Sequence, residues 1–130
     1  MNQLKQKFAH LKAEITKVKG DFTLFALVLR EDAPDRWDLL VAAPWASEDK
    51  DAAVKYLVSE IQTLLEPQDL IRLSKIVVAD PNNQLVQAFT GALALEGGGP
   101  VEISDSIFFG VPVHHAYVYA AKRPEVPVHG

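Results

Sequence analysis

The run FTLFALVLR, at residues 22–30, is apolar at nearly every position. A strand with one face in water alternates between apolar and polar side chains, whereas a strand buried on both faces is apolar throughout. The run therefore predicts a strand in the centre of a sheet, covered on both faces. The chain is therefore restricted to folds in which other strands flank residues 22–30 and other elements cover both faces of this strand.

Four further runs are typical of strands. The run RWDLLVAAPW, at 36–45, follows a polar connection of five residues, and the two runs together predict a β-hairpin. Asp38 and Pro44 favour a position nearer an edge of the sheet for this second strand. The remaining strands are expected at SKIVVA (74–79), VEISDSIFF (101–109) and VPVHHAYVYAAKR (111–123).

An amphipathic helix is predicted over residues 1–20. Its apolar residues recur at helical spacing, and Gly20 follows them where a C-capping glycine is expected. Two heptads are too short to form a coiled coil alone, so we expect this helix to pack on the body of the domain or on its twin in a dimer. The apolar residues of the stripe are Leu4, Phe8, Leu11, Ile15 and Val18.

Two more helices are predicted from capping signals. Ser47, followed by three acidic residues, is expected to cap a helix that ends near Glu66, because Pro67 cannot continue it. The run QDLIRL, at 68–73, favours a short extra turn of helix. The Asp-Pro pair at 80–81 is typical of another helix start, with Leu85, Val86 and Phe89 facing the core.

The order of these elements is α-β-β-α-β-α-β-β. Hairpins at both ends with helices between them do not fit a regular alternation of strand and helix. We therefore predict one α+β domain over residues 1–130, with a mostly antiparallel five-stranded sheet and helices packed mainly on one face. The second and third strands are expected to run parallel, joined by a right-handed crossover through the long helix. Residues 124–130, with two prolines and a terminal glycine, are expected to fray.

Composition excludes several classes of protein. The chain has no cysteine, which removes disulfides, thiolate metal sites and thiol nucleophiles. No run approaches the 18 or so consecutive apolar residues of a membrane span, and the lysine-rich first twenty residues do not resemble a secretory signal. We expect a cytoplasmic protein without membrane association. Five lysines stand against one glutamate in that first segment, but the rest of the chain is acidic, which disfavours nucleic-acid binding.

The adjacent His114 and His115 are the most conspicuous candidates for chemistry. In a regular strand they point to opposite faces, so they cannot bind one metal together, and no metal site is predicted. The neighbours of His114 on its face are small and apolar, which favours a core position under the helices. His115 then shares the more exposed face with Tyr117 and Tyr119. A β-bulge at this point would re-aim one of the two side chains.

A proton-transfer site is the chemistry that these residues favour over metal binding. The candidate catalytic residues are His115, Asp105 and Tyr117, since a base needs an orienting partner. No serine lies in a G-x-S-x-G turn; Ser104 lies in a strand-like run. The loop EGGGP, at 96–100, lacks the features of a nucleotide-binding loop, and no cofactor is predicted. Its glycines are suited to a loop that closes over a ligand, and the candidate ligand-binding residues are Gly98, Tyr119, Trp37 and Trp45.

Two functions remain open on the sequence. The favoured one is a small, non-enzymatic interaction or regulatory module that self-associates as a dimer or binds a protein partner. It rests on the separable amphipathic first helix and on the lack of a recognisable catalytic motif. The alternative is a small-molecule-binding domain, sensory or catalytic, with its site between the Gly97–Gly99 loop and the last strand.

Overall fold

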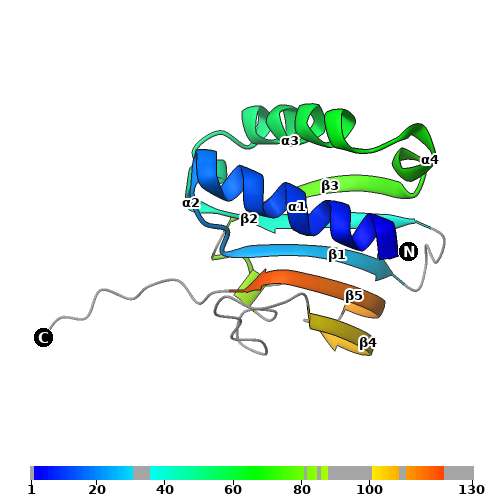
Figure 1. Ribbon diagram of the computed structural model, residues 1–130. Helices are drawn as coiled ribbons and strands as arrows, with labels where there is room; N and C mark the ends of the chain where they lie inside the picture. Colours follow the sequence, from blue (N-terminus) through cyan, green and yellow to red (C-terminus); the bar gives the residue numbers. More distant parts are fainter. Residues whose placement is uncertain are drawn as a thin grey trace, which may run out of the picture.

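A computed structural model describes residues 2–30, 36–80, 82–84, 86–87, 101–108 and 111–121 of the chain. Five strands form one sheet in the order β3-β2-β1-β5-β4 (Figure 1). The strands are β1 (Leu24–Arg30), β2 (Trp37–Ala42), β3 (Leu73–Ala79), β4 (Val101–Phe108) and β5 (Val111–Ala121). The central position predicted for the first strand is confirmed. The second strand is an interior one, and all six of its residues are buried, Asp38 included.

The sheet is mixed rather than purely antiparallel. β1 pairs antiparallel with β2 on one side and with β5 on the other, and β4 also pairs antiparallel with β5. β2 and β3 run parallel, as the expected crossover requires, because the chain passes through a long helix before it returns to the sheet. The predicted α+β class and the mostly antiparallel sheet of five strands are thus confirmed, with one parallel pair.

The helices of the middle segment begin and end at capping groups. Pro44 opens a short helix, α2 (Pro44–Ser47), which leads into the long helix α3 (Lys50–Leu64). The Asp49 side chain accepts a hydrogen bond from the Ala52 amide at 3.1 Å, so the N-cap of the long helix is Asp49 and the prediction of Ser47 was wrong. A single turn, α4 (Pro67–Leu70), follows as expected; its capping box joins Glu66 and Asp69.

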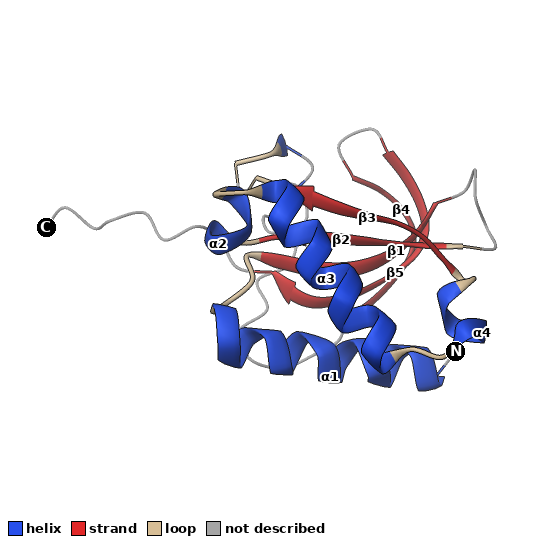
Figure 2. Ribbon diagram, turned by 90° about the horizontal axis from the view of Figure 1, so that it is seen from above, coloured by secondary structure: helices blue, strands red, loops and turns tan. Residues whose placement is uncertain are grey.

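One face of the sheet is covered by α1 (Asn2–Lys19) together with α3. Figure 2 shows both helices on the same side of the strands. The predicted stripe of α1 is buried from its first to its fourth member, whereas its last member, Val18, is 71% exposed. The first helix therefore packs on the body of its own domain. The buried side chains of this helix-side cluster include Leu4, Phe8, Leu11, Ile15, Phe25, Leu57, Ile61, Tyr117 and Tyr119.

The opposite face of the sheet carries a second buried cluster of smaller side chains. It is formed by alternate residues of β1, β2 and β5, together with Val86 from the segment after β3. Both faces of β1 are therefore covered, as its sequence predicted. The members of this cluster are Leu24, Ala26, Val28, Leu40, Ala42, Ala79, Val86, Val113, Ala116, Val118 and Ala121.

Part of the predicted organisation lies outside the described residues. Of the helix expected after Asp80, the structure shows hydrogen bonds from the Asn83 amide to the Asp80 carbonyl and from the Gln87 amide to the Asn83 carbonyl. The connection at 31–35, the glycine loop with Gly98 and the tail at 124–130 belong to the part of the chain that the structure does not describe.

Candidate functional site

The two histidines of β5 lie at an irregularity in its pairing with β1. Leu29 pairs with His115 but the next residue of β1, Arg30, pairs with Val113, so His114 is an extra residue in this ladder. An unbroken strand would place Val113 and His115 on the same face. Here Val113 is buried in the second cluster, while His115 lies on the helix side beside Tyr117. The bulge thus places Val113 on the opposite face, while His115 stays on the helix side that it shares with Tyr117.

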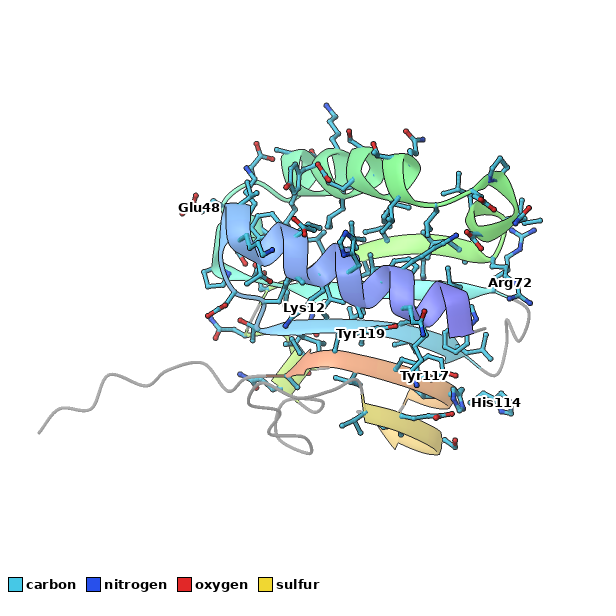
Figure 3. All side chains as sticks on the ribbon, viewed as in Figure 1. Lys12, Glu48, Arg72, His114, Tyr117 and Tyr119 are labelled. Atoms are coloured by element: carbon cyan, nitrogen blue, oxygen red, sulfur yellow. The ribbon has the colours of Figure 1, made fainter. Side chains whose placement is uncertain are left out.

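The faces predicted for the two histidines were wrong. His114 is exposed rather than buried in the core (Figure 3), and it takes part in interactions of its own. The row formed by His115, Tyr117 and Tyr119 lies on the side of α1, where both tyrosines are buried. The physical reason is size: the space beneath α1 takes the large rings, and the tighter opposite face takes Ala116 and Val118.

Both ring nitrogens of His115 are hydrogen-bonded to side chains of the edge strand β4. Ser104 Oγ lies 3.1 Å from His115 Nδ1, and Glu102 Oε1 lies 2.6 Å from His115 Nε2. Ser104 is the direct cross-strand partner of His115, and Glu102 lies two residues earlier on the same face of β4. Regular strand pairing alone therefore brings a hydroxyl, an imidazole and a carboxylate into one chain of contacts.

When His115 is neutral, the hydrogen bonds that join Ser104, His115 and Glu102 have a defined direction. An ionised carboxylate only accepts hydrogen bonds, so Glu102 requires the proton of a neutral His115 to be on Nε2. His115 Nδ1 is then an acceptor, and the Ser104 hydroxyl donates to it. This is the arrangement in which a histidine can take a proton from a serine while a carboxylate orients the ring.

Aromatic rings hold His115 in place. The ring of Tyr117 lies edge-on to it at a centroid distance of 5.0 Å, and that of Trp37 lies edge-on at 6.0 Å. Trp37 and Tyr117 stack on each other at 5.3 Å, and both are buried. His115 packs against these two buried rings and remains partly exposed, with 22% of its side chain accessible.

The first turn of α1 borders the same area. The Lys5 ammonium lies 5.0 Å from the centre of the Tyr117 ring, and the Lys5 carbonyl accepts a hydrogen bond of 2.8 Å from the Tyr119 hydroxyl. The structure pairs the Lys5 ammonium with no carboxylate among the residues that it describes. We call the whole area the β4–β5 ledge; it consists of Lys5, Trp37, Glu102, Ser104, His115 and Tyr117.

The two tyrosines of β5 are poor acids in this environment. Burial raises the pKa of Tyr117, and the Glu102 carboxylate nearby raises it further. Burial also raises the pKa of Tyr119, whose hydroxyl is already committed to the backbone of α1. Neither phenol is therefore suited to give up a proton near neutral pH.

The structure brings together some of the predicted site residues and separates others. His115, Tyr117 and Trp37 converge on the ledge, whereas Tyr119 lies beneath α1. Trp45 lies past the other end of β2, in α2, where it packs against the rings of Phe22 and Tyr56. The side chain of Asp105 and the whole of Gly98 fall outside the described residues.

Sequence reasoning missed Glu102 and Ser104 as partners of His115. Their signal was present in the alternation of β4, which places residues 102 and 104 on the same face. The pairing register of β4 with β5 was needed to set that face opposite His115. A search for G-x-S-x-G turns cannot find a serine that is positioned by cross-strand pairing.

Comparison of the chain with protein-family models, with curated proteins and with solved structures found no match. Within the described residues, no three His, Asp or Glu side chains are grouped so that they could hold a metal ion. None of the described helices has the length and apolar content that a membrane crossing needs.

Proposed function

We propose that this protein binds a small polar molecule on the β4–β5 ledge and that His115 exchanges a proton with it. The observation that carries the proposal is the chain from Ser104 Oγ through the His115 ring to Glu102 Oε1. Both ends of this chain are exposed to solvent, and the ring between them is fixed by buried aromatic side chains. A fixed, partly exposed base with an orienting carboxylate is suited to proton transfer.

The packing of α1 weakens the other hypothesis, the interaction module that the sequence favours. The apolar stripe of α1, which was to supply a dimer interface, is used inside the domain, since Leu4 and Leu11 are 4% and 3% exposed. Among the described residues, the large apolar side chains that are well exposed are Val18 and Ile71, which do not form a patch. Self-association and a protein partner remain predictions, and the part of the chain that the structure describes offers no exposed apolar patch to support them.

The ligand is expected to be a small anion. Lys5 provides a cation at the ledge, and an aromatic carboxylate can pair with this ammonium while its ring packs beside His115. Benzoate is the probe, and benzamide is its uncharged counterpart.

The two tryptophans of the chain provide a reporter of binding and an internal control in the same protein. Benzoate should shift the indole N–H resonance of Trp37 in a saturable way and leave that of Trp45 unchanged, because only Trp37 belongs to the ledge. Lys5→Gln should abolish the shift, whereas Lys12→Gln, at another lysine of α1, should not. Equal movement of both indoles, or no saturable shift of Trp37 with benzoate, would reject the proposal.

A further inference from the structure

We infer that Ser104 is a nucleophile that accepts an acyl group from small carboxylic esters. The inference rests on the proposed function, because it uses the same ledge, but it adds a covalent step and a class of substrate. It depends on three groups in contact: the Ser104 hydroxyl, the His115 imidazole and the Glu102 carboxylate.

The first step is acylation of the serine. As Ser104 Oγ attacks the ester carbonyl carbon, its proton passes to His115 Nδ1, 3.1 Å away, and a C–O bond forms. The imidazolium that results is stabilised by Glu102, which keeps the proton on Nε2 at 2.6 Å. When the tetrahedral intermediate collapses, the bond to the leaving oxygen breaks and His115 returns its proton to that oxygen. The products are a free alcohol and an acylated Ser104.

Water completes the cycle. A water molecule gives its proton to His115 Nδ1 as its oxygen attacks the acyl carbon, and the bond from that carbon to Ser104 Oγ breaks. The proton then passes back to Ser104, so the enzyme is regenerated and the ester has been split into an acid and an alcohol. No oxidation or reduction takes place, and water is the only co-reactant.

The fold holds this geometry without a strained turn. Ser104 and His115 are direct partners in adjacent strands, which fixes the separation of their Cα atoms, and Glu102 is placed by the alternation of β4. The edge-on rings of Trp37 and Tyr117 limit rotation of the imidazole. Because β4 is the last strand of the described sheet and its residues 102 and 104 are exposed, an ester can approach Ser104 from solvent.

Two probes test the inference on the full chain. A fluorophosphonate reacts with activated serines by forming a P–O bond and releasing fluoride, and p-nitrophenyl acetate reports acyl transfer by releasing p-nitrophenol. Both should modify Ser104, as mapped by peptide mass spectrometry. Ser104→Ala should abolish the modification, and His115→Gln should slow it on the order of a hundredfold or more. Glu102→Gln should slow it while shifting the pH profile, because the imidazolium loses its partner.

Ser74→Ala is the matched control, because Ser74 is an exposed serine on the other edge strand, β3. It should leave the rate of modification unchanged. The assignment of Ser104 as a nucleophile would be overturned if Ser104 were not labelled, or if His115→Gln were labelled at the parental rate. If benzoate still shifts Trp37 in that case, the binding proposal stands and only the covalent step fails; if benzoate fails as well, both are rejected.

Discussion

At the residue scale, the molecule is governed by pairs whose members are far apart in the sequence. The Tyr119 hydroxyl donates a hydrogen bond to the Lys5 carbonyl, 114 positions away, whereas the His115 imidazole is held by Ser104, which lies 11 positions earlier in the adjacent strand β4. The sequence identified His115 and Tyr117 as candidates but assigned the helix side to the small residues Ala116 and Val118, whereas the structure places the large rings there. Side-chain chemistry was therefore readable, whereas side-chain direction was not.

Another such pair joins Lys7 of α1 to Asp69 of α4. The Lys7 ammonium donates a hydrogen bond of 2.6 Å to Asp69 Oδ2, and this bond is the main reason why the pKa of Asp69 lies below its ordinary value of 3.8. A carboxyl whose pKa is lower in the folded state stabilises the fold at pH values above its ordinary pKa. That contribution is lost as the pH falls through the lowered value.

Lys7→Gln should therefore reduce stability most at neutral pH, and the deficit should shrink as the pH falls below about 4. The bond is lost while the capping box of Asp69 stays intact, because that box uses the Glu66 amide. Urea unfolding at a series of pH values measures the effect. Lys12→Gln, which changes the same charge elsewhere on α1, should show no such dependence; a deficit of constant size for Lys7→Gln would contradict the assignment.

At the scale of elements, α1 shows what a helical pattern does and does not reveal. The spacing of Leu4, Phe8, Leu11 and Ile15 predicted a helix with one buried face, and all four are buried. The pattern alone left open whether the face packs on its own domain or on a second copy, because both partners bury the same stripe. The ring of Phe8 lies 6.5 Å from that of Phe25 in β1, so the partner of this helix is the sheet.

Phe8→Ala should cost about 3–5 kcal/mol of the free energy of unfolding, because a side chain that is 1% exposed leaves a cavity between α1 and β1. Chemical denaturation measures the loss. Val18→Ala is the matched control on the same helix; at 71% exposure it should change stability by no more than about 0.5 kcal/mol. Equal effects of the two substitutions would show that α1 does not pack on the sheet through Phe8.

At the scale of the whole molecule, the sheet is organised around β1. The sequence predicted this, because residues 22–30 have no polar face to give to solvent. It predicted the crossover to β3 as well, since a long helix intervenes between the two strands. The order of the remaining strands was not predictable, because the insertion of β5 beside β1 depends on pairing across most of the chain.

Hydrogen exchange should reproduce this organisation. The amides of β1, paired on both sides and covered on both faces, are expected to exchange most slowly. Those of the edge strands β3 and β4 should exchange faster, with rates measured residue by residue by NMR at neutral pH. Protection that is greatest in β3 would contradict a core built on β1.

The position of β5 also has a consequence for synthesis on the ribosome. β1 is synthesised early, but β5, one of its two neighbours, begins only at Val111. About 80 further residues must therefore be synthesised before that edge of β1 can pair. At about 5–20 residues per second, this interval lasts roughly 4–16 seconds. Throughout it, the most apolar strand of the nascent chain carries an open edge, the kind of surface on which unfinished chains pair with one another. We therefore expect chaperones to bind the nascent chain until the last strand has left the exit tunnel.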